Sequence, residues 1–181
     1  MSAPVSLAVR WLAPAALLCG CVALATRVPG TIGSLWVTAV VGVIGLLGPL
    51  PPYGGGRPGV ARWLGTVALG VGAFAAARWL RPPLVAAPGL PSAYAANTLA
   101  AVAEELFFRR FMYGWLLRWG AGLAAGGSAA AFAAVHLPAY GMRALPIDLA
   151  AGLLFGWQRW ASHDWWPPAL THVVANILQT A

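Results

Sequence analysis

The chain has 181 residues, of which 60% are hydrophobic and only 8% are charged, and its formal net charge is +7. These values, with a mean hydropathy of +0.75, exclude an intrinsically disordered chain and fit poorly with a water-soluble domain. The basic residues are dispersed rather than clustered with aromatic residues, which argues against a nucleic-acid partner. The composition therefore predicts an integral membrane protein in contact with the lipid bilayer.

Apolar stretches of about 20 residues are long enough to cross a bilayer, and Pro, Gly and Arg divide this chain into about seven of them. We therefore predict an all-α fold, a polytopic transmembrane bundle of about seven helices. A proline-rich linker separates a front half without motifs (1–91) from a back half with motifs (92–181), within one integral membrane domain. The predicted spans are Val5–Thr26, Thr31–Leu50, Val60–Leu80, Ser92–Trp119, Ala121–Leu137, Ala144–Trp160 and Pro167–Ala181.

The arginines and tryptophans lie mostly at the ends of these stretches, as interfacial anchors and topology signals do. A slight excess of arginines in alternate loops predicts a cytoplasmic amino terminus. Abundant Ala, Gly, Pro and Arg indicate a GC-rich bacterial genome, and hence a multi-pass protein of the inner (cytoplasmic) membrane. The arginines that we interpret as anchors are Arg10, Arg27, Arg57, Arg62, Arg78, Arg81, Arg118, Arg143 and Arg159.

Two adjacent carboxylates, Glu104 and Glu105, interrupt the fourth apolar stretch of a chain with only four acidic residues. A charge at mid-membrane costs about 2.5 to 3.5 kcal/mol on insertion scales, so we expect the pair to face a polar cavity or a partner. Arg109 follows Glu105 by four residues, in the acid-first order that favours an ion pair on one helical face. Glu104 lies about 100° away around the helix. We therefore expect Glu105 to be neutralised by Arg109 and Glu104 to remain for chemistry.

Isolated polar residues also occur in later apolar stretches. His136 ends the sequence Phe132-Ala133-Ala134-Val135-His136, and His172 precedes Asn176 by four residues, which puts an imidazole and a carboxamide on one helical face. A lone histidine in a membrane can also serve only as a hydrogen bond between helices. The functional hypothesis is that Glu104, His136, His172 and Asn176 converge in one buried chamber.

These residue types support hydrolysis. A carboxylate in an apolar site is a useful general base for water near neutral pH, and a nearby histidine can share the proton. His172 and Asn176 can donate hydrogen bonds to an oxyanion as a carbonyl becomes tetrahedral. The chain has no G-x-S-x-G motif, and neither Cys19 nor Cys21 neighbours a histidine. The sequence therefore favours hydrolysis without a covalent nucleophile and without a cofactor.

Zinc is the alternative cofactor. Glu104, His136 and His172 could supply three ligands and leave an open coordination position. The H-E-x-x-H pattern is absent, and Asn176 is a poor zinc ligand. Distributed ligands also bind zinc, so the spacing leaves this alternative open.

Several other polar and aromatic residues have two interpretations. Asp148 either pairs with Arg143 or approaches the chamber. His163 and Asp164 are expected to form a solvated turn, while Trp165 and Trp166 are either interfacial belt residues or part of a substrate entrance. Gly152 and Gly156 form a GxxxG face that predicts helix packing.

Glu104-Glu105-x-x-x-Arg109, Phe132-x-x-x-His136 and His172-x-x-x-Asn176, taken in order, resemble the three motifs of the CPBP family (CAAX proteases and bacteriocin-processing enzymes, also called Abi). The resemblance covers about residues 92 to 181. It implies an intramembrane endopeptidase, of the glutamate type or metal-dependent, in which Glu104 and His136 activate water while His172 and Asn176 stabilise the oxyanion. Glu105 and Arg109 would hold the site together.

The implied partner is a membrane-embedded peptide or protein substrate. Bacteria generally lack prenylated CAAX proteins, so a membrane peptide is the expected substrate, and removal of carboxy-terminal sorting helices is one role found among relatives. The competing hypothesis is a non-catalytic membrane protein, either a bacteriocin-immunity or scaffold protein or a small transporter that uses the carboxylates as a proton relay. A transporter should show internal repeats or broken helices, and the sequence shows neither.

Overall fold

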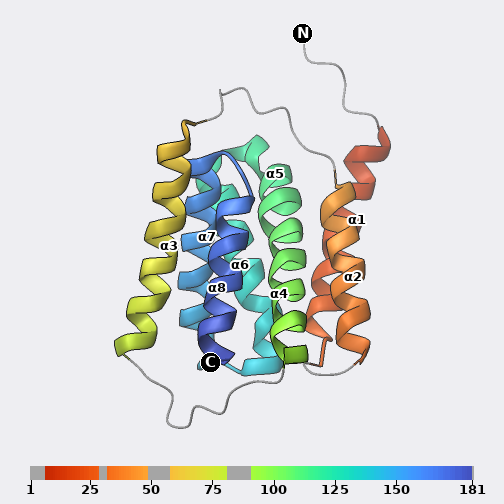
Figure 1. The fold of residues 1–181 in the computed structure, drawn as a ribbon. Helices are drawn as coiled ribbons and strands as arrows, with labels where there is room; N and C mark the ends of the chain where they lie inside the picture. The colour runs from red at the N-terminus through yellow and green to blue at the C-terminus, as the bar shows by residue number, and fades with distance from the viewer. Residues whose placement is uncertain (1–6, 29–31, 49–57, 81–90, 181) are drawn as a thin grey trace.

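Helices form all the regular secondary structure in the described part of the chain, which a computed structural model defines for residues 7–28, 32–48, 58–80 and 91–180 (Figure 1). This confirms the predicted all-α fold. The elements are α1 (Leu7–Ala25), α2 (Ile32–Leu47), α3 (Val60–Leu80), α4 (Pro91–Glu105), the π-helical segment η1 (Leu106–Met112), α5 (Tyr113–Leu116), the 3₁₀ turn η2 (Leu117–Trp119), α6 (Ala121–Tyr140), α7 (Leu145–Ser162) and α8 (Trp166–Thr180).

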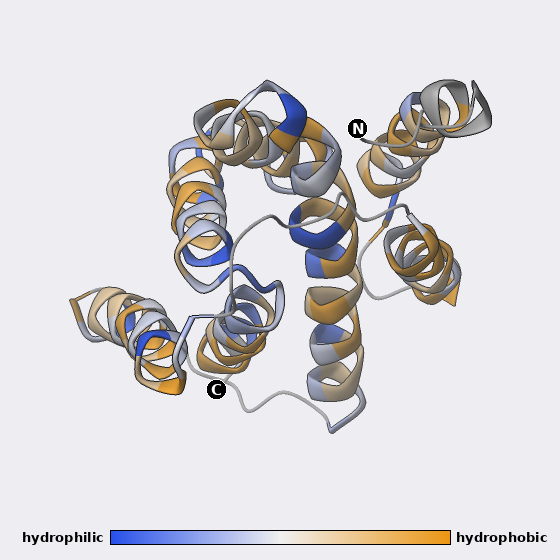
Figure 2. Ribbon diagram, turned by 90° about the horizontal axis from the view of Figure 1, so that it is seen from above, coloured by the Kyte–Doolittle hydropathy of each residue, from blue (hydrophilic) through white to orange (hydrophobic). Residues whose placement is uncertain are grey.

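The long helices run alternately up and down, and α4 lies in the middle of the bundle, with α2 on one side and α8 on the other (Figures 1 and 2). The helix α6 packs on α7 and also contacts α1. Up-and-down bundles place functional side chains in the interior, between facing helices. The helices α4, α6 and α8, which carry the sequence motifs, meet in this interior.

The fifth predicted span was expected to end before Pro138, and this boundary is wrong, because α6 continues to Tyr140. A proline inside a helix removes one backbone hydrogen bond. Here the loss falls in the last turn, where the helix ends at Gly141 with φ of 73° and the Gly141 N–H donates to the Leu137 carbonyl at 2.8 Å. Glycine readily adopts this left-handed conformation, so the C-terminal cap completes the turn that Pro138 weakens.

The fourth predicted span is not one regular helix, because the seven residues of η1 follow α4 with π-helical hydrogen bonding. Phe107, Phe108 and Arg109 in this segment are all fully buried. Phe111 and Met112 are buried as well, so the segment is enclosed on most sides by α2, α6 and α7. Single π turns are often found at functional sites.

Close helix packing depends on small residues at specific contacts. A Cβ added at Gly45 of α2 would lie 2.4 Å from the Leu106 backbone, and one added at Gly152 of α7 would lie 2.9 Å from Ala129 Cα of α6. Gly156 approaches Ala125 of α6 in the same way. The Gly152 and Gly156 face therefore packs within this chain, as the GxxxG spacing predicts.

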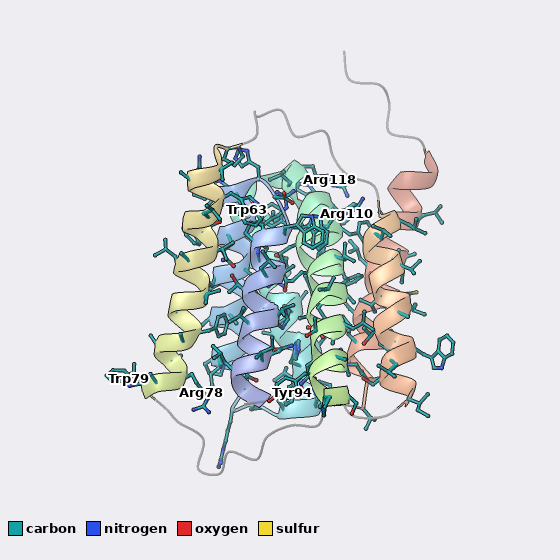
Figure 3. The ribbon with its side chains drawn as sticks, in the orientation of Figure 1. Trp63, Arg78, Trp79, Tyr94, Arg110 and Arg118 are labelled. Carbon is teal, nitrogen blue, oxygen red and sulfur yellow. The ribbon has the colours of Figure 1, made fainter. Side chains whose placement is uncertain are left out.

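Large hydrophobic residues are exposed on the outer faces of the bundle, and the ribbon is orange where the residues are hydrophobic (Figure 2). Leu47, Leu69 and Leu18 are each more than 60% exposed, an arrangement suited to lipid rather than water. By length and composition, α3 and α6 can each cross a membrane. Trp63, Arg110 and Arg118 lie near one end of the bundle, and Arg78, Trp79 and Tyr94 lie near the other (Figure 3).

One predicted anchor lies in the interior instead. Arg159 is only 3% exposed, its Nε donates to the Arg109 carbonyl at 3.0 Å, and its guanidinium lies 5.3 Å from the Tyr113 ring centroid. The anchor interpretation is therefore wrong for Arg159, because the Arg109 carbonyl of the π-helical segment binds its side chain inside the bundle. Arg118 is exposed at the bundle end, with its guanidinium 4.0 Å from the Trp115 ring centroid.

Candidate active site

Glu104 and Glu105 are the last two residues of α4, and the helix directs them to different neighbours. Glu104 is 3% exposed and Glu105 is fully buried. Charged groups buried this deeply need specific partners, because transfer from water is costly for an isolated ion. The partners of the two carboxylates define two linked parts of the site.

Glu105 forms a buried ion pair with Arg109. Arg109 Nη1 donates to Glu105 Oε1 at 3.0 Å, and Nη2 donates to the Gly152 carbonyl at 3.2 Å. The guanidinium also lies 4.7 Å and 5.0 Å from the ring centroids of Phe132 and Phe155. Arg109 thus connects the end of α4 to α6 and α7, and the negative charge of Glu105 is neutralised locally.

Glu104 is also ion-paired, which differs from the expectation that it stays free of such contacts. Arg27 Nη1 lies 2.8 Å from Glu104 Oε1, while Glu104 Oε2 lies 3.7 Å from His136 Nε2 and 4.0 Å from His172 Nε2. Arg27 lies just beyond α1, and its side chain is only 12% exposed. The anchor interpretation of Arg27 is therefore wrong, since a buried carboxylate binds the guanidinium inside the bundle.

Both histidines direct the same ring nitrogen toward Glu104. His136 Nδ1 lies 2.7 Å from the Phe132 carbonyl, and His172 Nδ1 lies 3.0 Å from Glu105 Oε1. A carbonyl and an ionised carboxylate can only accept, so Nδ1 carries the hydrogen in each ring. The Nε2 atoms of both rings are thereby presented to Glu104 Oε2.

Glu104, His136, His172 and Asn176 line one cavity of about 120 Å³, which is large enough to hold water. Asn176 Nδ2 donates to the Asn97 carbonyl of α4 at 3.2 Å. The structure thus brings the four predicted catalytic side chains to one place. The other residues of this wall are Arg27, Asn97, Ala100, Tyr140 and Gln179.

A second cavity of about 280 Å³ adjoins the first and shares His136, Tyr140, His172, Asn176 and Gln179 with it. Its remaining wall is mainly apolar and includes Phe74, Phe132, Ile147 and Phe155. Asp148, whose position the sequence left open, also lies in this wall. The two cavities together form one chamber with a polar part at Glu104 and a larger apolar part.

The segment between α7 and α8 lies apart from the chamber. His163 there has φ of 55°, and Asp164 Oδ1 accepts from the Trp166 N–H at 3.4 Å, so His163 and Asp164 form a turn. Trp165 and Trp166 stack on each other, with ring centroids 4.3 Å apart. Neither indole lines either cavity, so the expectation that these tryptophans form the substrate entrance is not supported.

Residues 85–178 match the sequence model of one family, described as type II CAAX prenyl endopeptidase Rce1-like. The chain belongs to this family. The resemblance to CAAX proteases is thereby confirmed, and the Rce1-like family is one of membrane-embedded peptidases. No curated protein and no solved structure matches the chain. All four motif residues of the chamber lie in the matched region, whereas Arg27 lies outside it.

Proposed function

We propose that this Rce1-like protein is an intramembrane endopeptidase in which Glu104 activates the water that attacks a peptide bond. The observation that carries the proposal is the approach of His136 Nε2 and His172 Nε2 to Glu104 Oε2, at 3.7 Å and 4.0 Å, beside a cavity large enough for water. One water molecule can bridge groups at this separation. Glu104 and His136 would together polarise that water for attack.

In the proposed mechanism, the Glu104 carboxylate takes a proton from the water as its oxygen bonds to the carbonyl carbon. The carbonyl oxygen becomes an oxyanion in the resulting tetrahedral intermediate. Glu104 then returns the proton to the amide nitrogen, the carbon–nitrogen bond breaks, and a carboxylic acid and an amine are released. No covalent bond to the protein is required at any step.

His172 and Asn176 are proposed to stabilise the oxyanion. Glu105 Oε1 accepts from His172 Nδ1 at 3.0 Å, which fixes the ring with Nε2 toward Glu104. In its doubly protonated form, in which both ring nitrogens carry hydrogen, the ring can donate from Nε2 to the oxyanion. Asn176 supplies a second donor from the same helical face, four residues along α8.

The apolar outer faces and the alternating helices favour a multi-pass protein of the inner membrane of a bacterium. We propose that its substrate is a membrane-embedded peptide or protein cut in or near its membrane segment, with processing of a carboxy-terminal sorting signal as one such role. Helices α3, α4, α6, α7 and α8 supply most of the chamber wall, which favours a substrate that lies in the bilayer.

A zinc-dependent version of this peptidase is the second candidate, and the ring orientation favours it. Histidines that bind metal usually donate their other N–H to a carboxylate or carbonyl, as His136 and His172 do. Against it, the Arg27 guanidinium already binds Glu104 Oε1 and would repel a divalent cation. No group of three or more His, Cys, Asp or Glu side chains has metal-binding geometry among the described residues. We therefore propose the metal-independent mechanism.

The proposal is tested by incubating purified wild-type protein in lipid vesicles with a panel of single-helix membrane peptides and identifying products by mass spectrometry. We expect cleavage by the wild type, with and without a strong zinc chelator, and none by Glu104→Gln. Loss of cleavage in chelator with recovery on added zinc would support the zinc enzyme. Cleavage of no peptide would favour a non-catalytic immunity or scaffold protein.

A further inference from the structure

The larger, apolar cavity beside the candidate active site holds one carboxylate whose purpose the proposed mechanism does not explain. Asp148 lies in its wall, together with Phe74, Phe132 and Phe155 from three different helices. Its Oδ2 atom is buried and has no hydrogen-bond partner within the described residues. A buried polar atom without a hydrogen bond is costly, so a donor from a bound group would stabilise it.

The position of Asp148 in the first turn of α7 explains why a negative charge is tolerated there, but it does not explain why Oδ2 has no hydrogen-bond donor. Backbone N–H groups and the helix dipole stabilise an anion at a helix N-terminus, and Asp148 is the acidic residue of that first turn. Its Oδ2 nevertheless takes none of these donors. Asp148 therefore contributes to the cavity wall a carboxylate with one oxygen that no donor of the described residues satisfies.

The walls around this carboxylate suit a group with an apolar body and a cationic end. The rings of Phe74 and Phe155 stack with centroids 5.7 Å apart, and Phe132 lies 6.1 Å from Phe155 at an interplanar angle of 88°. Methylene stems pack on such surfaces while the charged head reaches a polar partner, and aromatic faces attract cations. Lysine and arginine side chains have this composition.

We propose that the Asp148 cavity is a specificity subsite that binds a basic side chain of the substrate. His136, His172 and Asn176 line both this cavity and the smaller one at Glu104. A side chain in the Asp148 cavity therefore belongs to a residue close to the bond that Glu104 would cut. The inference rests on the proposed function for the identity of the ligand as a peptide substrate.

The volume is consistent with one long side chain. About 280 Å³ is the space of roughly nine water molecules at about 30 Å³ each. A basic residue within an otherwise apolar membrane segment is costly to place in lipid, so a site that pairs its charge would distinguish such a segment from an entirely apolar one. The subsite would thus select membrane segments that contain a basic side chain.

The test measures binding apart from cleavage, with Glu104→Gln as the inactive background. Fluorescent single-helix peptides carry one Lys, or the similarly shaped and uncharged Met, at successive positions, and their dissociation constants are measured in lipid vesicles. We expect Lys to strengthen binding at least tenfold over Met at one position. The preference should disappear when Asp148→Asn is added and persist when Asp164→Asn is added, since Asp164 is the chain's other aspartate and lies in the turn outside the cavity.

Charge exchange provides the second arm. With Asp148→Lys in the same background, a peptide carrying Glu at the selected position should bind better than the Lys peptide. A Lys preference that survives Asp148→Asn, or no Lys preference at any position, would overturn the subsite. If the protein is not a peptidase, the result differs: the wild type cuts none of the peptides, although the Asp148-dependent preference for Lys in binding is present.

Discussion

Arg27 Nη1 lies 2.8 Å from Glu104 Oε1, and this contact joins the end of α1 to the carboxylate proposed as the general base. Oε2 is left facing His136 and His172. The guanidinium thus occupies one oxygen of Glu104 and directs the other toward the two imidazoles. Arg27, which lies outside the family-matched region, therefore supplies a charged partner to Glu104, which lies inside it.

Replacing Arg27 should reduce catalysis more than binding. A hydrogen bond to a charged group contributes about 1.5 to 3 kcal/mol, and 1.36 kcal/mol corresponds to tenfold in rate. We expect Arg27→Ala to lower kcat about 10- to 100-fold with a smaller change in KM, and Arg27→Lys to recover part of the loss. Steady-state cleavage of one peptide by each variant measures the separate effects on kcat and KM.

Arg118→Ala is the control for this prediction, because Arg118 is exposed at the bundle end beside Trp115. It should retain wild-type kcat. Equal activity of Arg27→Ala and the wild type would show that the Arg27 contact has no role in orienting Glu104.

Arg109 should be required for folding rather than for chemistry alone. It is fully buried and binds Glu105 and the Gly152 carbonyl. Removing one partner of a buried ion pair costs about 3 to 5 kcal/mol, because the other charge is left without compensation. We expect Arg109→Ala to lower the free energy of unfolding by about this amount, as measured by denaturation in detergent. Unchanged stability would contradict the structural role assigned to the Glu105–Arg109 pair.

Asn176 should contribute to the rate through the oxyanion. Loss of one oxyanion donor typically lowers kcat about 10²- to 10³-fold. Asn176→Ala should show this loss with little change in KM, in single-turnover cleavage of the best peptide of the panel. Asn97→Ala is a useful comparison, since the Asn97 carbonyl that accepts from Asn176 belongs to the backbone and is preserved. A loss of the same size in Asn97→Ala would point to general damage of the cavity wall.

The contact between α2 and the π-helical segment should tolerate no added methyl group. A Cβ at Gly45 would lie 2.4 Å from the Leu106 backbone, whereas a Cβ at Gly72 of α3 would meet nothing within 4 Å. Overpacking costs about 1 to 3 kcal/mol, so Gly45→Ala should lower the unfolding temperature. Gly72→Ala should not, because alanine has the higher helix propensity. Similar melting temperatures for the two variants would contradict the close approach of α2 and η1.

The sequence predicted the motif-bearing helices well because their signals are local. Runs of apolar residues define spans, and four-residue spacings place Glu105 with Arg109 and His172 with Asn176 on shared faces. The predicted span Val60–Leu80 coincides with α3. The position of Arg27 at the end of an apolar run, by contrast, fits both an interfacial anchor and an ion-pair partner of a buried carboxylate. Only the packing of α1 against the bundle shows which of these two roles Arg27 has.

The π-helical geometry of η1 and the position of Asp148 could not be predicted from the sequence either, because both depend on how the helices pack. The π-helical hydrogen bonding of η1 departs from the 3.6 residues per turn that helical periodicity assumes throughout. The sequence left two alternatives for Asp148, an ion pair with Arg143 or a place in the chamber, because spacing along the chain allows both. Its place in the wall of the larger cavity depends on how α7 packs on α6, α3 and α8.

A comparison of the two adjacent glutamates tests the assignment of Glu104 as the general base. Glu104→Gln and Glu105→Gln differ by one position and make the same change of a carboxylate to an amide, and both cleavage and melting temperature are measured for each. We expect Glu104→Gln to abolish cleavage while the protein remains folded, and Glu105→Gln mainly to lower the melting temperature, because Arg109 loses its buried counter-charge. Cleavage at the wild-type rate by a folded Glu104→Gln variant would show that Glu104 is not the general base.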